Sequence, residues 1–516
     1  MREVVIAGYL RTALSRSRPS EPARDWFCRM RADELLAKLL PELIKRTGVP
    51  AEAIDDFLVG CATAVGEQWA YGGRIPIFMA NLPRTIPAKF VDQQCGSSMA
   101  GIQIGFMEIA QEFADVVLCA GYEHMTRVAM GMSNVEKGLL APNMTLFLSP
   151  EYQHWDIMTS MNMGLTAEKL TAQSKITRAE MDRWGTRSHQ LASKARSEGF
   201  FADEILPVEA VQADGSVLRV DTDQAVRDDA TYEGMAELRP AFKKDGVITP
   251  GNASPLNAGA TAMILMSKET AKKRGIRPLA TIRSIGFAGV DPTVMGAGPV
   301  PASRKALERA GLQAGDIDFW EINEAFSVVA LNCIQELGID PNRVNVMGGG
   351  IAIGHALGAT GIPQPEPGQA PSSPCEDDRP VARHRGLHLI VGAGLVLVFE
   401  GLLWALAPQI AQRLLEMAAE TPPSTLRASG WIAAATGLAI ATVSRALKDA
   451  PDIGEDTKRR VRETAALLGY RPNRAGVRLA RDAIARHRDQ MQEGEPPFIL
   501  GSIGPVRSPD VPVALA

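Results

Sequence analysis

Short runs of β-branched and aliphatic residues alternate with amphipathic stretches over the first 361 residues of the chain. The runs that predict strands are REVVIAG, FLVGCA, DVVLCAG, TAMILMS and DFWEINEA. The stretches that predict helices are ADELLAKLLPELIKRTG, SMAGIQIGFMEIAQEF and PASRKALERAG. This alternation is typical of an α/β protein in which helices cover parallel sheets.

The pattern changes beyond residue 386. The run LHLIVGAGLVLVFEGLLWALAP, residues 387–408, has 22 residues and one charged side chain, Glu400. Its length suits a membrane crossing. The alternative is a buried helix or strand pair of the preceding domain, which Glu400 favours because a carboxylate at bilayer depth costs a few kcal/mol. Both interpretations stay open. A shorter apolar stretch follows at 428–443.

Composition is that of a soluble chain with several domains. A length of 516 residues with 46% hydrophobic content is enough for the cores of two to four domains. The net charge of −4 predicts no general affinity of the whole chain for nucleic acid. Six cysteines without regular spacing favour a reducing compartment, with no disulfide or zinc framework. With no signal-peptide run at the N-terminus, we expect a cytoplasmic protein without a metal site.

A cysteine stands at the centre of the run VDQQCGSSMAG. This cysteine, Cys95, lies where small residues suit a strand-to-helix turn. A helix N-terminus stabilises a thiolate, so the position predicts a nucleophile with a lowered pKa. The alternative is a buried cysteine that packs as a small hydrophobic residue.

Two later segments favour the nucleophile. EINEAF, residues 321–326, is interpreted as the end of a strand that carries Asn323 and Glu324. The glycine-rich segment NVMGGGIAIGHALGATG, residues 345–361, contains His355. A general base must deprotonate the thiol, and an amide with an imidazole can hold a donor or a water on a developing oxyanion.

These segments resemble the thiolase family, the acetyl-CoA acyltransferases, over residues 1–361. The motifs that carry the resemblance are VDQQCGSSMAGIQIG, GNASPLNAGATA, GPVPASRKALERAG, EINEAF and GHALGATG. The resemblance implies that Cys95 takes the acyl group, that His355 activates it and that Asn323 helps bind the oxyanion water. It also implies that Ser254 contacts the pantetheine arm of coenzyme A.

The resemblance further implies substrates, assembly and fold. The substrates would be acyl-CoA and acetyl-CoA thioesters, with no permanently bound cofactor, and the assembly would be a homodimer or homotetramer. The fold would be α/β, with two similar βαβαβ-type halves and a loop domain. The expected boundaries are 1–127 with 251–276 for the N-terminal half, 128–250 for the loop domain and 277–361 for a truncated or disrupted C-terminal half.

One departure from the family affects the chemistry. Thiolases carry a second cysteine in a cysteine-x-glycine-glycine strand end, which serves as acid and base for the condensing acetyl group, and the chain leaves the family pattern after Gly361. Cys375 lies among prolines and acids and is interpreted as an exposed loop thiol. If 388–400 keeps the family's last strand pair, His388 takes the place of the missing cysteine. We therefore expect impaired condensation.

The remaining segments differ in character. Residues 362–385 are proline-rich and predict a disordered linker, whereas 386–430 form an apolar helical segment. Residues 386–443 resemble a family of small bacterial inner-membrane proteins with two apolar helices. That resemblance allows membrane contact through 387–408 and association with the inner membrane.

Residues 431–480 resemble the helix-turn-helix headpiece of the lactose-repressor family, and 481–516 form a tail. The resemblance implies DNA contacts by Thr442, Ser444, Arg445, Asn473 and Leu479. Residues 442–489 hold 12 Lys or Arg against 7 Asp or Glu, a net charge of +5 that fits such a role. Two alternatives to an acyltransferase therefore stay open, namely a DNA-binding regulator and a catalytically silent fused or frameshifted chain.

Overall fold

The computed structural model describes residues 1–130, 138–139, 143 and 145–360 of the chain. Its strands are β1 (Val4–Thr12), β2 (Ser15–Arg16), β3 (Asp56–Gly60), β4 (Ala88–Val91), β5 (Val116–His124), β6 (Ile205–Leu206), β7 (Val208–Val211), β8 (Val217–Val220), β9 (Asn257–Ser267) and β10 (Ala280–Ile282). Its α-helices are α1 (Ala32–Thr47), α2 (Arg74–Met79), α3 (Ser97–Ala110), α5 (Thr145–Leu148), α6 (Ile157–Ser160), α7 (Met163–Ser174), α8 (Arg178–Ser197), α9 (Tyr232–Ala236), α10 (Lys268–Lys273), α11 (Pro299–Ala310) and α12 (Ser327–Leu337).

A mixed sheet forms the centre of the described fold. Its order is β10-β1-β9-β5-β3-β4, with β2 paired to β9 and β6 paired to β1. The expected parallel arrangement holds for β3 with β4 and β5. It is wrong for β9, which runs antiparallel to both β1 and β5. The long insertion between β5 and β9 allows the chain to re-enter the sheet in the opposite direction.

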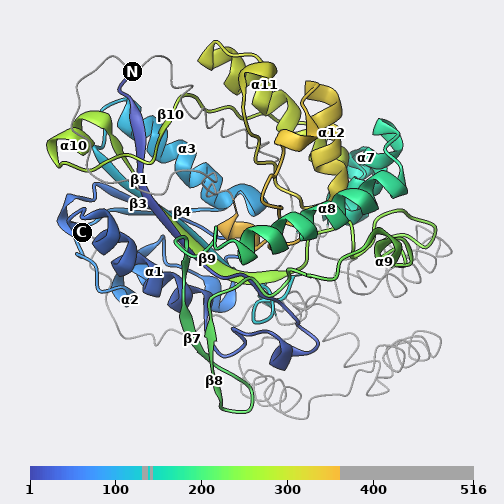
Figure 1. The fold of residues 1–516 in the computed structure, drawn as a ribbon, viewed down its shortest axis with the longest axis horizontal. Coiled ribbons are helices and arrows are strands. Elements are labelled where there is room, and N and C mark those ends of the chain that lie inside the picture. Colours follow the sequence, from blue (N-terminus) through green and yellow to red (C-terminus); the bar gives the residue numbers. More distant parts are fainter. Residues whose placement is uncertain (131–137, 140–142, 144, 361–516) are drawn as a thin grey trace, which may run out of the picture. The chain divides into compact units, whose positions relative to one another are not determined.

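Helices cover both faces of this sheet, α1 on one face and α3 on the other (Figure 1). Along β5, the side chains of Val116, Leu118 and Ala120 belong to the hydrophobic cluster that includes α1. The side chains of Val117 and Cys119 belong to the cluster that includes α3. Burial on both faces explains why the strand is a continuous apolar run instead of an alternating one.

The region that begins at 283 is built differently within the described residues. It contains α11, which the sequence predicts, and α12. It contains no strand up to residue 360. The strand predicted over DFWEINEA is therefore wrong, and only an isolated bridge joins Trp320 to Val344. The backbone of Ile322 is bound instead by Asn345, whose side chain accepts from its amide and donates to its carbonyl, each at 2.8 Å. These two bonds use the backbone amide and carbonyl of Ile322, which a neighbouring strand would bind in a sheet.

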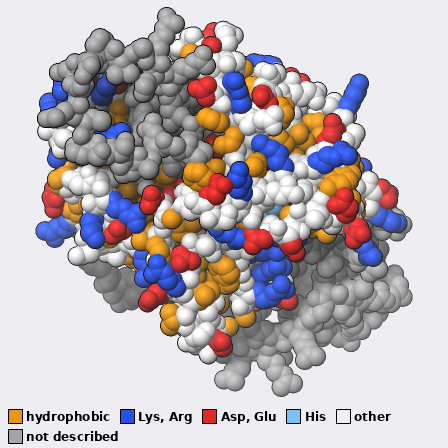
Figure 2. Space-filling view, viewed as in Figure 1, with side chains coloured by type: hydrophobic (Ala, Val, Ile, Leu, Met, Phe, Trp, Pro, Cys, Tyr) orange, Lys and Arg blue, Asp and Glu red, His pale blue; other side chains and the backbone are white. Residues whose placement is uncertain are grey.

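The insertion between β5 and β9 carries helices α5 to α9 and the hairpin of β7 and β8. Thr177 and Glu180 form a capping box at the start of α8, which stabilises the longest helix of this insertion. β6 pairs with the end of β1, where Arg11 lies opposite Ile205, so the insertion is joined to the central sheet. On the face shown in Figure 2, Lys and Arg side chains are interspersed with Asp and Glu.

Candidate active site

Cys95 lies in a 3-10 turn, Gln94–Gly96, that leads directly into α3. Gln94 has a φ of +48°, and its side-chain amide donates to the carbonyl of Ala62 at 3.1 Å. Gly60, at the end of β3, is packed so closely that a Cβ there would lie 2.6 Å from the amide nitrogen of Ser98. The end of β3 and the start of α3 thus pack backbone to backbone, as the small residues after Cys95 predict.

The Cys95 side chain is half-buried and packs against the apolar cluster of Ala62, Met125 and Leu357. Burial and the carboxylate of Glu123 raise the pKa of its thiol to about 12. The expectation of a lowered pKa is therefore wrong for the protein without substrate. Although α3 starts beside Cys95 without a side-chain cap, desolvation and a buried negative charge outweigh its partial positive charge.

His355 is buried, and its two ring nitrogens have different partners. Its Nδ1 lies 2.6 Å from the Thr360 hydroxyl, and this hydroxyl also lies 3.2 Å from the carbonyl of Ala356. A hydroxyl has one proton, so when it donates to this carbonyl it accepts from Nδ1–H. The Nε2 atom lies 3.4 Å from the amide nitrogen of Asn323, which donates. Both contacts fit the tautomer in which Nε2 carries the lone pair.

This arrangement leaves His355 as a neutral base. Burial lowers the pKa of the imidazole to about 4, so the ring is unprotonated near pH 7. Its backbone amide donates to Asn257 Oδ1 at 2.8 Å, and Asn257 donates to the carbonyl of Ser15 at 3.0 Å. Gly354 has a φ of +125°, and a Cβ there would lie 2.7 Å from the Asn257 side chain, so glycine is required.

The segment after His355 packs against the turn that carries Cys95. Thr261 donates to the carbonyl of Ala359 at 2.9 Å, and the Ser98 hydroxyl donates to that of Thr360. Gly358 lies so near β3 that a Cβ would approach the Cα of Cys61 to 2.5 Å. The thiol and the imidazole therefore belong to segments that are fixed to each other through short contacts.

Asn323 is exposed, whereas its neighbour Glu324 is fully buried. Four donors surround the Glu324 carboxylate, namely Trp184 Nε1 (2.8 Å), Asn345 Nδ2 (2.8 Å), the Ser188 hydroxyl (2.7 Å) and the amide of Ile351 (3.2 Å). Burial raises the pKa of this carboxyl, and the donors act in the opposite direction. Glu324 thus joins α8 and the glycine-rich loop at 349–351 to the segment that carries Asn323.

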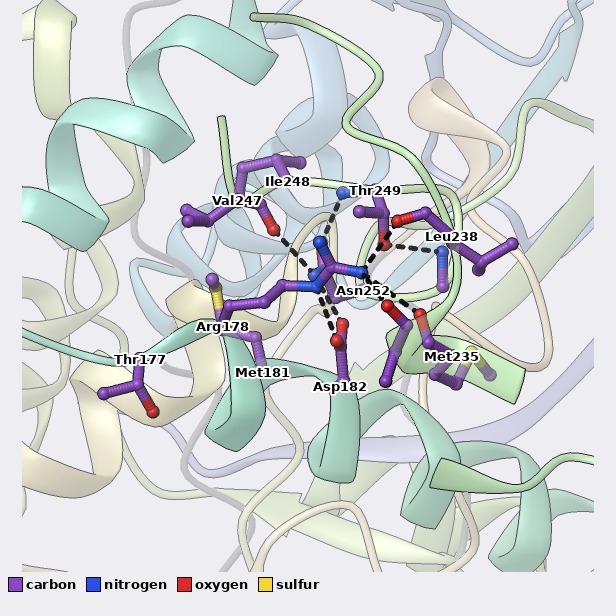
Figure 3. Close-up of polar contacts among 12 residues, drawn as sticks. Thr177, Arg178, Met181, Asp182, Met235, Leu238, Val247, Ile248, Thr249 and Asn252 are labelled. Carbon is purple, nitrogen blue, oxygen red and sulfur yellow. Dashed lines mark hydrogen bonds and ion pairs between the residues drawn. The ribbon is translucent and has the colours of Figure 1, made fainter. Parts of the chain in front are cut away.

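Ser254 is partly buried, and its amide donates to the carbonyl of Ala325 at 3.0 Å. The loop that leads to it is held by a polar cluster in the insertion, shown in Figure 3. There Asn252 donates to Asp182 at 2.9 Å and accepts from the amide of Thr249 at 2.9 Å. Arg178 forms an ion pair with Asp182 and donates to the backbone carbonyls of Met235, in α9, and of Leu238, just after it. Ser254 is therefore adjacent to the segment that carries Asn323.

The structure thus brings His355 and Asn323 together and puts the segments of Cys95 and Ser254 beside them. The other predicted residues lie outside the described residues, and these are His388, Cys375, Thr442, Ser444, Arg445, Asn473 and Leu479. Sequence reasoning missed the roles of Thr360, Asn257 and Glu123. The signal for Glu123 was present, since a single carboxylate ends the apolar run of β5.

Within the described parts of the chain, His, Cys, Asp and Glu side chains form no group of three that could hold a metal ion. The helices of these parts include none that is long and apolar enough to cross a bilayer. The apolar run 387–408 lies beyond them.

Comparison with known proteins agrees with this geometry. The thiolase N-terminal domain family matches residues 4–269, and the thiolase C-terminal domain family matches residues 276–365. A 3-ketoacyl-CoA thiolase from Marinobacter nauticus is 38% identical over 367 residues, covering 70% of this chain and 89% of the relative. A probable acetyl-CoA acyltransferase from Staphylococcus aureus is 40% identical over 331 residues, covering 64% and 84%.

The crystal structure of the Bacillus anthracis acetyl-CoA acetyltransferase is similar in fold, with a TM-score of 0.61 and 34% identity. The similarity covers 70% of this chain and 89% of that one. Fold and relatives define a thiolase-like α/β enzyme of the acyltransferase class. The chain belongs to the thiolase family, which confirms the resemblance and the predicted fold class.

Two further families match beyond the thiolase region. An uncharacterised family conserved in bacteria matches residues 389–444, and the lacI family of bacterial regulatory proteins matches residues 432–473. Both resemblances predicted for the C-terminal segments are thereby confirmed.

Proposed function

We propose that the chain transfers acyl groups between coenzyme A thioesters through an acyl-Cys95 intermediate. The observation that carries the proposal is the state of His355. The Thr360 hydroxyl accepts a hydrogen bond from Nδ1–H, the lowered pKa keeps the ring neutral, and Nε2 carries the lone pair in a segment packed against that of Cys95. The names of the relatives, which include a 3-ketoacyl-CoA thiolase, support acyl-CoA thioesters as substrates.

The half-reaction conserves protons and electrons. His355 Nε2 takes the proton of the Cys95 thiol as its sulfur attacks the thioester carbonyl. The Asn323 amide, beside Nε2, supports the developing oxyanion directly or through a water. The carbon–sulfur bond to coenzyme A then breaks, and the departing thiolate takes the proton from the imidazolium. In the second half-reaction a coenzyme A thiol attacks the acyl-Cys95 carbonyl, its proton passes to Nε2, and the bond to Cys95 breaks as its sulfur takes that proton. With a 3-oxoacyl-CoA as the acyl donor, Cys95 attacks the 3-oxo carbon, the bond between carbons 2 and 3 breaks, and the departing acetyl-CoA carbanion takes a proton.

Ser254 is proposed to bind the pantetheine arm. Its position beside Ala325, two residues from Asn323, supports this role because the arm must reach the reacting carbonyl along that segment. The coenzyme is a substrate in this proposal, not a resident cofactor. The proposal also includes a cytoplasmic homodimer or homotetramer.

Condensation is proposed to be strongly reduced or absent, and cleavage of 3-oxoacyl-CoA to be impaired with it, because the group that deprotonates acetyl-CoA in one direction returns the proton in the other. The match to the thiolase C-terminal domain family ends at residue 365, and the proposal is that the motif with the second cysteine does not follow it. Deprotonation of acetyl-CoA then lacks its usual base, with His388 as the candidate replacement. A proton donor displaced by about 1 Å can lower a rate about a hundredfold.

The test is thiolysis of acetoacetyl-CoA by the full-length protein beside a Cys95→Ser variant. Turnover in the wild type that falls at least about a thousandfold in the variant is the expected result. Trapping of a radiolabelled acetyl group on the Cys95 peptide identifies the intermediate. Equal turnover of both proteins would reject Cys95 as the nucleophile.

A second function is favoured by the match of residues 432–473 to the lacI family. In this alternative the headpiece binds DNA and the thiolase region only dimerises it. Salt-dependent binding to a palindromic duplex, lost in Arg445→Ala, would support it. A folded protein with neither DNA binding nor thiolysis would be the catalytically silent fused chain.

Membrane contact through 387–408 predicts that detergent, and not high salt, releases the protein from membranes.

A further inference from the structure

Glu123 is a fully buried carboxylate at the end of β5 that the proposed acyl transfer does not use. Five donors surround it, namely the amides of Ala62 (2.8 Å), Thr63 (3.2 Å) and Gly358 (3.0 Å), the side-chain amide of Gln68 (2.7 Å) and the thiol of Cys61 (3.6 Å). Burial raises the pKa of this carboxyl, but every one of these partners donates. The proton of a neutral carboxyl would face another donor, so the network fits the ionised form.

The network joins two regions of the chain. Ala62, Thr63 and Gln68 follow β3, whereas Gly358 lies three residues after His355. The contact of Gly358 with β5 is direct, because a Cβ on Gly121 would lie 2.2 Å from the Gly358 carbonyl. Without a side chain at either glycine, the loop of His355 reaches the carboxylate with its own backbone amide.

The Cys95 side chain lies beside this network. It packs against the apolar cluster of Ala62, Met125 and Leu357, in which the amide of Ala62 donates to Glu123 and Leu357 precedes the donor Gly358. The titratable groups on the segments that pack together here are Glu123 from β5, the thiol of Cys61 after β3, His355 from the glycine-rich segment and the exposed Asp92, and Glu123 is the one that acts on the pKa of Cys95. Of these, His355 is neutral and Cys61 is a buried thiol, so Glu123 is the buried charge near Cys95.

We propose that Glu123 is a positioning residue that fixes the loop of His355 against the turn of Cys95, and that its buried charge keeps this thiol protonated in the absence of substrate. The second effect protects the thiol, since the thiolate is the form that oxidants and alkylating agents attack. Proton transfer to Nε2 then accompanies attack on a bound thioester. The inference rests on the proposed role of Cys95 as nucleophile.

The test measures the pH dependence of Cys95 alkylation, with iodoacetamide as the probe and mass spectrometry of the Cys95 peptide as the readout. The full-length protein is compared with Glu123→Gln and Glu123→Asp. In Glu123→Gln, which removes the charge at nearly constant shape, the midpoint should fall by about one pH unit. Glu123→Asp keeps the charge and should stay close to the wild type in midpoint while its kcat falls.

Glu324→Gln is the matched control, because Glu324 is equally buried and accepts from four donors but does not contribute to the pKa of Cys95. Its alkylation midpoint should equal that of the wild type. Equal midpoints in Glu123→Gln and the wild type would overturn the inference. A shift of the same size in Glu324→Gln would also overturn it, since general loosening of the site would then explain the change.

The wild type provides a measurement that does not depend on folding of the variants. Its Cys95 midpoint should lie above the ordinary cysteine value of about 8.5, and a midpoint at or below that value would contradict the inference. The readout needs no turnover. Absence of thiolysis in a folded wild type would reject the proposed function, while the alkylation curves would still decide the role of Glu123.

Discussion

The half that carries Cys95 and the region that carries Asn323 and His355 both have an apolar core, but their site segments are fixed in different ways. In the first, the paired strands of the central sheet and two covering helices fix the turn of the nucleophile. In the second, residues 283–360 form no strand, and buried polar side chains fix the loops. Asn345 takes the place of a strand partner for Ile322, and Glu324 joins three segments.

The difference separates two kinds of sensitivity to mutation. Apolar packing is spread over many contacts, so one truncation lowers stability while the geometry of the turn is retained. A buried polar network depends on each donor and acceptor, because an unpaired buried group is costly and its neighbours shift to satisfy it. We therefore expect mutations in the second region to change catalysis more than stability.

The largest effect is expected for His355→Ala. Loss of the base should lower the rate of Cys95 acylation by about a thousandfold, within the range of general base catalysis. Single-turnover acylation by acetoacetyl-CoA measures it, and circular dichroism checks the fold. The matched control is His154→Ala, an exposed histidine in the insertion, which should acylate at the wild-type rate. Equal losses in both variants would show that the loop does not position a base.

Glu324→Gln should lower kcat about a hundredfold. The amide of glutamine would face the donors Ser188 and Ile351, so the segment of Asn323 should move away from His355. Leu118→Ala in β5 is the comparison from the first half. It should lower the free energy of unfolding by about 3 kcal/mol in a urea titration but keep kcat within about threefold. If Leu118→Ala loses as much kcat as Glu324→Gln, the two regions do not differ in the way proposed.

The sequence predicts the first region better than the second, because the second depends on single polar side chains. Strands β1, β3, β5 and β9 and helices α1, α3 and α11 follow from apolar periodicity, because their burial is spread along the element. Apolar periodicity does not show that Asn345 bonds to Ile322, because this contact depends on a single polar side chain. A strand was therefore predicted where an irregular loop forms.

The site shows the same division. The order of Cys95, Asn323 and His355 and their loop composition were enough to identify them as candidates, and the resemblance supplied their roles. The direction of the Cys95 pKa could not be predicted, because Glu123 lies 28 residues further along the chain and reaches the site only through the fold. The role of Thr360 required a distance that no spacing rule provides.

Acid should destabilise the second region through His355. Its pKa is about 4 in the folded protein and about 6.5 in the unfolded chain, so the unfolded chain binds a proton first as the pH falls. Its contribution to stability is complete above pH 6.5 and is lost progressively down to pH 4. Between pH 7.5 and pH 5 the wild type should lose about 2 kcal/mol more than His355→Gln in urea titrations. Parallel curves for both proteins would show that the imidazole is not buried in its neutral form.

The smallest effect, and the one that tests the tautomer directly, is expected for Thr360→Val. Valine has nearly the same shape as threonine but cannot accept a hydrogen bond from Nδ1–H. Both tautomers then become populated, and part of the protein presents a protonated Nε2 to Cys95. We expect kcat to fall about tenfold, in the range for loss of a partner that orients a histidine. Nitrogen NMR of labelled histidine should show the Nδ1–H form in the wild type and a mixture in the variant. Thr360→Ser keeps the hydroxyl and should restore both the spectrum and the rate. If Thr360→Val kept a single Nδ1–H tautomer, the position of the base would be fixed by the surrounding backbone, and the second region would depend on its polar side chains less than the contrast with the first half implies.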